Sequence, residues 1–253
     1  LFFTNKGKVH WLKVYSVPEV SRIGKGKAIV NLLQLGEGEK VSAFIPVEKF
    51  DEEHNLILVT KKGTIKKTRL DAFNNPRKTG IICITLTEGD ELIGAEMTKK
   101  EQQMILATKK GNAIRFKESD VRAAGRSAQG VKGINLKQGD EVMGMVSAKG
   151  DETLLTITEN GFGKRTDIDE YRLVGRGGSG VINIKCSERN GNVVDICSLK
   201  ENDDVIFISR NGIVIRVNAS NISKIGRATQ GVRLMRVGEG DKVVSATVTK
   251  ETV

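Results

Sequence analysis

Short apolar runs alternate with glycine-containing polar turns along the whole chain, and the same arrangement recurs five times. Each repeat begins with an apolar run, at residues 1–3, 56–59, 104–107, 154–157 and 205–208. Each run leads to a polar pair followed by a turn glycine: Gly7, Gly63, Gly111, Gly161 or Gly212. A polar pair ending in glycine between β-prone runs predicts a hairpin, because the turn requires a positive φ.

Each repeat continues in the same order after its turn glycine. A second strand, such as residues 64–70, leads through a loop to a second glycine, and a third strand such as 131–136 follows. The second glycines are Gly26, Gly80, Gly130, Gly180 and Gly231. An acidic turn, replaced by Asn190-Gly191 in the fourth repeat, then precedes a fourth strand such as 141–146.

The turn glycines recur about every 50 residues. Four short strands in a repeat of this length are typical of propeller blades. We therefore expect an all-β fold, a propeller-like ring of four-stranded blades, as a single domain over residues 1–253. The five repeats cover approximately residues 1–47, 56–98, 104–148, 153–199 and 205–249.

The ends and the hydropathy of the chain limit its class. No apolar run approaches the roughly 18–20 residues of a membrane span, so we expect no membrane partner. Leu1-Phe2-Phe3 lacks a basic flank and predicts a strand, not a signal peptide. Because the sequence has no initiator methionine, we expect a piece of a longer protein.

Positive charge is concentrated in one part of each repeat. The net charge is +10. The five windows from two residues before each turn glycine to the second glycine carry +18, and the remaining residues carry −8. The windows are 5–26, 61–80, 109–130, 159–180 and 210–231. An acidic partner is indicated, and the acid of the protein itself is set apart in other turns.

Two basic positions recur in register with the turn glycine. Fifteen residues after it stand Arg22, Lys78, Arg126, Arg176 and Arg227. Four residues after it stand Lys67, Arg115, Arg165 and Arg216, and Trp11 takes this place in the first repeat. On a ring of blades these cations would form a belt, which matches the closely spaced phosphates of a DNA duplex and could bend it.

The belt predicts double-stranded DNA as the partner, held through its backbone with weak sequence preference. The alternative is an ordinary solvated surface rich in lysine. Aromatic residues make up only 4% of the chain, which disfavours the stacking of single-stranded bases. The predicted DNA-binding residues are Lys8, Lys13, Arg22, Lys25, Lys27, Lys66, Lys67, Arg69, Arg77, Lys78, Arg115, Lys117, Arg122, Arg126, Lys164, Arg165, Arg172, Arg176, Arg216, Lys224 and Arg227.

Other motifs give weaker signals. Gly175 to Gly180 spells G-x-G-x-x-G, but a β-like run follows it where a dinucleotide site needs a helix. The acidic turns lack calcium-loop spacing, and no nucleophile–base set is visible. We expect no catalytic residue, metal or cofactor in this chain.

The remaining distinctive side chains are predicted to be structural. Three cysteines, Cys83, Cys186 and Cys197, stand among apolar residues and are interpreted as buried thiols of a reducing cytosol. Trp11, Tyr15 and Tyr171 are interpreted as packing residues, and residues 48–55 as a loop between blades.

The first repeat closely resembles the C-terminal domain of the A subunit of bacterial DNA gyrase. The resemblance is carried by residues 1–9, 12–15, 21–22 and 25–33, and the later repeats match in pattern. It implies a β-pinwheel, a propeller-like fold in which neighbouring blades exchange strands. It also implies that the domain wraps DNA for ATP-dependent negative supercoiling by a type IIA topoisomerase, an isomerase of the bacterial cytoplasm.

The resemblance further implies partners, and the chain departs from the family pattern in two respects. The partners would be the remainder of the gyrase A protein and the gyrase B protein, which carry the catalytic tyrosine and use ATP and magnesium. The family usually has six blades and a Gln-Arg-Arg-Gly-Gly-Lys-Gly box, whereas five repeats and no such box occur here. We expect the missing blade to precede Leu1. Gly125 to Gly130 and Gly175 to Gly180 stand in the corresponding loop of other repeats.

Three other functions are weighed against this one. The C-terminal domain of the topoisomerase IV A protein is a relative without the full box, although the first repeat favours gyrase. A protein-interaction propeller would need Trp-Asp or paired-glycine blade motifs, which are not found. A ring-shaped enzyme would need a catalytic set.

Overall fold

The computed structural model describes residues 1–21, 24–99, 101–148 and 151–249, and its regular elements are strands and short 3₁₀ turns. The all-β prediction is therefore confirmed. The chain divides into two compact units. One comprises Leu1–Lys100 with Val121–Val131, and the other comprises Glu101–Asp120 with Lys132–Val253.

The first unit is built on two antiparallel sheets. The first sheet has the order β3 (Val41–Phe44), β1 (Phe2–Thr4), β2 (Lys8–His10) and β6 (Ile81–Ile82). The second has the order β10 (Val131–Lys132), β5 (Thr64–Arg69), β4 (Asn55–Thr60) and β7 (Leu92–Thr98). The central hairpin of each sheet is the one that its turn glycine predicts.

The second unit contains three sheets of the same plan. The first is β11 (Val142–Ala148), β8 (Gln103–Thr108), β9 (Asn112–Lys117) and β14 (Val181–Ile182). The next is β15 (Val193–Leu199), β12 (Thr153–Thr158), β13 (Phe162–Asp167) and β18 (Val232–Arg233). The last is β17 (Val214–Asn218), β16 (Asp204–Ser209) and β19 (Val243–Thr249).

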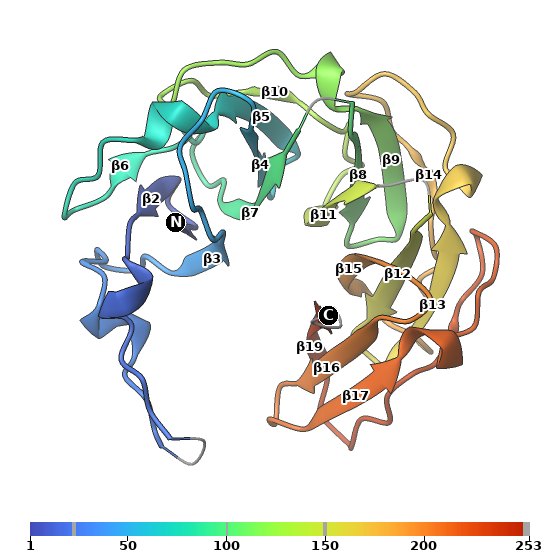
Figure 1. Cartoon of the computed structure of the whole chain (residues 1–253). Helices are drawn as coiled ribbons and strands as arrows, with labels where there is room; N and C mark the ends of the chain where they lie inside the picture. The colour runs from blue at the N-terminus through green and yellow to red at the C-terminus, as the bar shows by residue number, and fades with distance from the viewer. Residues whose placement is uncertain (22–23, 100, 149–150, 250–253) are drawn as a thin grey trace. The chain divides into compact units, whose positions relative to one another are not determined.

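The outermost strand of a sheet comes from the following repeat. In the second unit β14 pairs with β9 and β18 pairs with β13, and Figure 1 shows β14 beside β9. In the first unit β6 pairs with β2. This arrangement is the strand exchange that the resemblance implied. The exchanged strands are two residues long, so the six-residue third strand predicted at 131–136 is wrong in length.

Four-stranded blades are confirmed for four sheets, and the fifth has three strands among the described residues. The fifth repeat itself contributes four strands as predicted, but its third strand, β18, pairs with the preceding sheet. Because each outer strand is supplied by the next repeat, the fifth sheet has no donor within residues 1–249.

The turn glycines Gly111 and Gly161 lie against the exchanged segment of the next repeat. Gly161 has φ +80°, and its carbonyl accepts hydrogen bonds from the Leu234 and Met235 N–H groups at 2.8 and 3.1 Å. A Cβ on Gly161 would overlap the Met235 carbonyl oxygen. Gly111 has the same relation to Ile184. Glycine is therefore required twice, for the left-handed conformation and for the close approach.

Apolar cores lie between neighbouring sheets of the same unit. In the first unit Phe3, Leu58 and Phe73 belong to one buried cluster. In the second unit one cluster includes Ile105 and Tyr171, and another includes Phe207. Burial of side chains of this size stabilises the fold by about 1.5–3 kcal/mol each. The sheets thus stack through the faces that the alternating pattern makes apolar.

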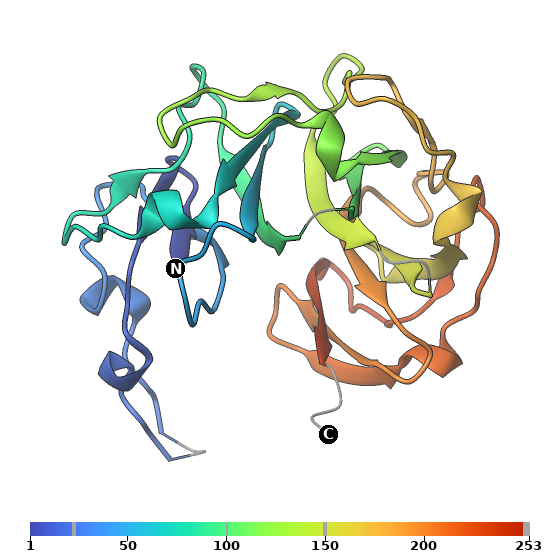
Figure 2. The same cartoon turned by 45° about the horizontal axis from the view of Figure 1, so that its top comes forward.

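Residues 14–21 and 24–35 of the first repeat extend away from the first sheet in both views (Figures 1 and 2). Their described part holds two 3₁₀ turns, η1 (Val14–Ser16) and η2 (Ile29–Asn31), and no strand. Most of its residues are exposed. This segment occupies the position in its repeat from which later repeats send a strand to the preceding sheet.

The two requirements on the turn glycine can be separated by matched substitutions. Gly212 has φ +83°, but a Cβ there would meet nothing within 4 Å. Gly212→Ala is expected to cost about 1–2 kcal/mol of unfolding free energy through the backbone conformation alone. Gly161→Ala adds the clash with Met235 and should cost at least about 3 kcal/mol. Denaturant unfolding measures both, and equal losses would contradict the role of the close approach.

Candidate nucleic-acid interface

The loop after the second strand of a repeat is fixed to the preceding repeat by a recurring pair of backbone contacts. Parallel bridges join Lys67 to Ala123, Arg115 to Leu173 and Arg165 to Lys224. The next N–H in each loop, from Ala124, Val174 or Ile225, donates to the carbonyl of Lys67, Arg115 or Arg165 at 2.8–3.0 Å. The three loops are therefore equivalent in geometry, and their side chains recur at fixed places.

The arginine fifteen residues after the turn glycine is half-buried in three repeats and holds the preceding exchanged strand. The Nη1 atom of each arginine donates to a carbonyl of the preceding repeat, that of the residue two positions after the second glycine of that preceding repeat. Arg126 bonds Ile82 at 3.3 Å, Arg176 bonds Lys132 at 3.0 Å and Arg227 bonds Ile182 at 3.3 Å. A guanidinium has five N–H donors, so each arginine also keeps donors for another acceptor.

The basic position four residues after the turn glycine varies in its environment. Arg165 is only 3% exposed and donates to the Ile222 carbonyl and the Glu201 carboxylate. Arg115 donates to the carbonyls of Ile168 and Tyr171 at 2.7 and 3.0 Å. Arg216 is exposed and paired with Asp204, and Lys67 is half-buried. The prediction that Arg165 contacts DNA is therefore wrong, because its charge is used inside the protein.

Lys66 and Lys164 are buried, and the prediction that they contact DNA is also wrong. Lys66 Nζ donates to the carbonyls of Cys83, at 2.6 Å, and Arg126. Lys164 Nζ donates to Thr166 Oγ1 and to the Gly226 carbonyl at 3.0 and 2.7 Å. Burial lowers the pKa of each ammonium from 10.5 to about 8. Each lysine thus fastens the next repeat's loop from within.

The other predicted cations lie at or near the surface. Eleven are exposed: Lys13, Lys25, Lys27, Arg69, Arg77, Lys78, Lys117, Arg122, Arg172, Arg216 and Lys224. Arg69 pairs with Asp71 and Lys224 pairs with Asp167. Lys8 is half-buried, 3.9 Å from a carboxylate oxygen of Glu39. Arg22 lies outside the described residues.

Eight of these exposed cations have no ion pair with another described residue: Lys13, Lys25, Lys27, Arg77, Lys78, Lys117, Arg122 and Arg172. An unpaired exposed cation can bind a phosphate without first giving up a protein partner. Each unit thus carries its own part of the candidate surface, with Lys117 and Arg172 in the second unit and the other six in the first.

Two exposed cations outside the predicted set extend this surface. Lys132 and Arg233 lie on the exchanged strands, each two residues after a second glycine. Arg233 and Arg189 stand over the Phe162 ring, with 5.1 and 4.8 Å to its centroid. The charge windows ended at the second glycine and so missed them, although their fixed distance from that glycine was a usable signal.

The aromatic predictions divide. Tyr171 is buried, and its hydroxyl donates to Asn183 Oδ1 at 2.6 Å, so its packing role is confirmed. Trp11 is partly buried, and its indole N–H donates to the Phe73 carbonyl. Tyr15 is 86% exposed, and its interpretation as a packing residue is wrong. Of the cysteines, only Cys83 is fully buried, and Cys186 and Cys197 are half-buried.

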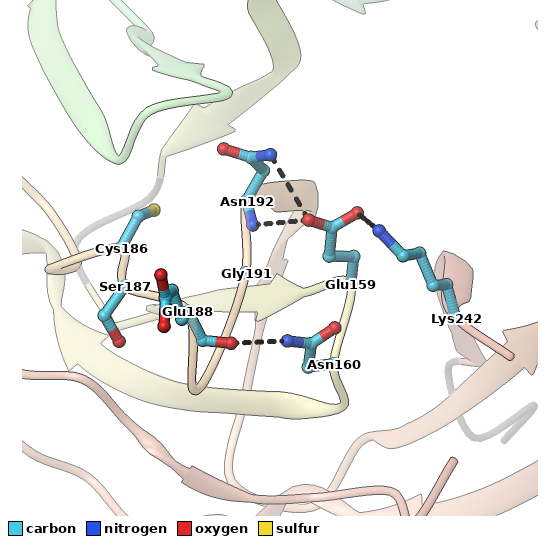
Figure 3. Close-up of a pocket in the computed structure, with 8 residues that line it drawn as sticks. All are labelled: Glu159, Asn160, Cys186, Ser187, Glu188, Gly191, Asn192 and Lys242. Atoms are coloured by element: carbon cyan, nitrogen blue, oxygen red, sulfur yellow. Dashed lines mark hydrogen bonds and ion pairs between the residues drawn. The ribbon is translucent and has the colours of Figure 1, made fainter. Parts of the chain in front are cut away.

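A polar hollow in the second unit differs from the basic loops. It is lined by Glu159, Asn160, Cys186, Glu188 and Lys242, among others (Figure 3). Glu159 accepts hydrogen bonds from Lys242 Nζ and from the backbone and side chain of Asn192. Burial would raise the pKa of Glu159, but these bonds outweigh it and lower the pKa. A carboxylate already held by its own lysine does not favour binding of DNA.

Neither a metal site nor a membrane span emerges from the described part of the chain. No cluster of three or more His, Cys, Asp or Glu side chains there is arranged to hold a metal ion. No helix in the same residues has the length and hydropathy to cross a bilayer.

The chain is similar to DNA gyrase C-terminal domains in sequence. A family model described as the DNA gyrase C-terminal domain, a beta-propeller, matches residues 1–48, 54–99, 102–149, 152–198 and 203–250. The DNA gyrase A protein of Halalkalibacterium halodurans is 56% identical over 245 residues, which cover 97% of this chain and 29% of the relative. The DNA gyrase A protein of Klebsiella oxytoca is 44% identical over 97% of this chain and 28% of its own length. The chain spans less than a third of these relatives.

The chain is also similar in structure to two solved C-terminal domains of topoisomerases. The DNA gyrase A C-terminal domain matches with a TM-score of 0.87 and 29% identity, over 98% of this chain and 80% of that one. The C-terminal domain of DNA topoisomerase IV matches with a TM-score of 0.89 and 25% identity, over 98% and 78%.

The buried lysines predict a pH dependence of stability. Their folded pKa near 8 lies below the usual lysine value of 10.5, so the unfolded chain binds more protons between these pH values. The free energy of unfolding should therefore rise with pH across this window, by up to about 1.4 kcal/mol per pH unit for each lysine. Below pH 8 both states are protonated and this contribution is flat.

Lys164→Met tests this prediction by denaturant unfolding from pH 7 to pH 10. The variant should lose the part of the slope that Lys164 supplies, whereas Lys137→Met, at an exposed lysine of the same unit, should keep the parent slope. Identical slopes for all three proteins would contradict the pKa assigned to the buried ammonium.

Proposed function

Because the chain belongs to the family of the DNA gyrase C-terminal domain, we propose that it binds duplex DNA along its basic loops and wraps or bends it. The observation that carries the proposal is the set of eight exposed, unpaired cations, most of them on the loops that follow the second strand of a repeat. Such cations replace the counterions of the DNA backbone and require no base contact. Cations that are already paired with carboxylates, such as Arg69, Arg216 and Lys224, contribute less to DNA binding in this proposal.

The domain would act as one part of a larger machine. In this proposal it presents the bound DNA to the remainder of the gyrase A protein and to the gyrase B protein, which perform ATP-dependent negative supercoiling. It carries no catalytic group and needs no cofactor of its own, since ATP and magnesium act elsewhere in the holoenzyme. The protein would work in the bacterial cytoplasm, associated with the chromosome.

Topoisomerase IV is the nearest competing assignment. Among the matched structures its C-terminal domain is 25% identical to this chain and that of gyrase A is 29% identical, and a gyrase A relative reaches 56% in sequence. The gyrase assignment is therefore favoured, and both assignments place duplex DNA on the same surface. A supercoiling assay of the whole enzyme distinguishes them, because gyrase introduces negative supercoils.

The salt dependence of duplex binding is the direct test of the proposal. If about five to ten phosphates are neutralised, the logarithm of affinity should fall with the logarithm of salt at a slope of about −4.5 to −9. Titration of a mixed-sequence duplex into the full chain at several salt concentrations measures it. A slope near zero would contradict binding through the phosphate backbone.

Charge reversal at two places separates a specific surface from net charge. Lys117, the last residue of β9, and Arg172, in the loop after β13, are exposed cations of the second unit. Lys137 and Arg236 are exposed cations of the same unit outside the charge windows. Lys117→Glu with Arg172→Glu should weaken binding at least about 50-fold at 0.1 M salt, since two phosphate contacts are lost. Unrelated duplex sequences should be affected alike.

The matched variant, Lys137→Glu with Arg236→Glu, makes the same change in net charge. It should weaken binding only a few-fold, because charges beyond about 10 Å are screened at this salt concentration. Equal losses for the two variants would show that net charge, not the basic loops, determines binding.

A further inference from the structure

Glycine precedes the register arginine in three equivalent loops, at Gly125, Gly175 and Gly226. None of the three has a positive φ. A Cβ on Gly125 or Gly175 would meet no atom within 4 Å. Neither backbone strain nor packing within the protein therefore explains the glycine at these two positions. The glycine leaves the loop backbone uncovered by any side chain at this point.

In the fifth repeat this bare backbone binds a carboxylate of the protein itself. The Arg227 N–H donates to Glu170 Oε2 at 3.0 Å. The same oxygen would lie 3.4 Å from a Cβ on Gly226, so the carboxylate sits directly against the glycine. Glu170 belongs to the preceding repeat, nine residues after its turn glycine. The place beside the glycine and the arginine N–H is thus able to hold an oxyanion.

The same place in the third repeat has no carboxylate at its centre. The residue nine positions after the preceding turn glycine is Ala72 there. Beside it lies a hollow, lined by Thr68, Arg69, Asp71, Ala72 and Gly125 together with the adjoining Ala123 and Ala124. Asp71 is paired with Arg69 and does not occupy the position of the Glu170 carboxylate. Because alanine replaces glutamate at position 72, the place that the Glu170 side chain fills in the fifth repeat is open in the third.

The charge behind the two places is the same. Buried Lys66 bonds the Arg126 carbonyl on the inner side of the third-repeat loop, as buried Lys164 bonds the Gly226 carbonyl in the fifth. Burial lowers the pKa of Lys164, and the charge of Glu170 opposes this effect. Lys66 likewise places an ammonium against the third-repeat loop, where Ala72 stands in the place of Glu170.

We propose that the hollow beside Ala72 and Gly125 receives a phosphodiester group of bound duplex DNA, with the Arg126 N–H as its backbone donor. Glu170 then serves as an internal substitute for a phosphate and closes the equivalent place in the fifth repeat. Backbone N–H groups are common donors to DNA phosphates, and a concave, bare backbone suits an oxyanion. The inference rests on the proposed duplex binding and names a contact point within it.

Removal of the internal carboxylate should open a further contact. In the full chain, Glu170→Ala is expected to raise duplex affinity about 8-fold at 0.1 M salt and to steepen the salt slope by about 0.9, the effect of one added phosphate. Glu239→Ala removes another exposed carboxylate, from an acidic turn, and is the matched control. It should leave the slope unchanged. Hydrogen exchange at the Arg227 amide should quicken in Glu170→Ala without DNA and slow again with DNA.

The reciprocal change should close the open place. Ala72→Glu recreates the fifth-repeat arrangement and is expected to weaken binding about 8-fold at 0.1 M salt, with a slope shallower by about 0.9. Gln138→Glu adds the same charge at an exposed turn and should leave the slope unchanged. Amide exchange at Arg126 without DNA should slow in Ala72→Glu if the new carboxylate bonds it, which also shows that the variant folds.

The outcomes separate the proposed function from the proposed phosphate position. If the unaltered chain binds no duplex, the proposed function fails and this inference fails with it. If the chain binds duplex with a steep salt slope but each loop variant behaves like its control, the phosphate position alone is overturned.

Discussion

The contact between a turn glycine and the exchanged segment of the next repeat is the constraint on which the rest of the structure depends. A carbonyl of the incoming segment lies where a Cβ would be, as Met235 does at Gly161, and the glycine carbonyl accepts two N–H groups from the same segment. Repeats joined in this way cannot slip by one residue, because a slip would place a side chain in that position. The register of successive repeats follows from it.

A fixed register turns a sequence period into a repeated surface. The loop that precedes each exchanged strand has to follow the second strand of the preceding repeat, which gives the bridges at Ala123, Leu173 and Lys224. Cations on these loops therefore recur in equivalent places. The same geometry explains why half-buried Arg126, Arg176 and Arg227 serve the fold as well, since each bonds a carbonyl of the strand that the preceding repeat donates.

Much of this could be predicted from the sequence, and the parts that could not have identifiable causes. Glycine spacing predicted the hairpins, because a left-handed turn has a local signature. Strand exchange left no local signal, since β14 pairs with β9 through a contact some 70 residues away in the chain. Lys164 and Lys117 are equally basic in sequence. Lys164 is buried and Lys117 is exposed, because a lysine can be buried where groups such as the Gly226 carbonyl of another repeat accept its hydrogen bonds.

The segregation of acid from the basic loops has a structural cause that the sequence did not reveal. Asp90, Asp140 and Asp241 in the acidic turns each accept an N–H from the hairpin turn of their own repeat, from Lys62, Lys110 and Asn211. Since these carboxylates stabilise the turns, the fold alone accounts for their position, independently of any binding partner. The turn lysines Lys62 and Lys110 belong to this acidic region and bond carbonyls in it.

The surface free for DNA is therefore smaller than the charge windows suggested, because Lys66, Lys164 and Arg165 are also engaged in the interior. Glu170 differs from the remaining exposed loop cations, because its carboxylate accepts the Arg227 N–H of the fifth-repeat loop. In the proposed arrangement, the residue at the Glu170 position of each repeat determines whether the loop of the next repeat is open to a phosphate or closed.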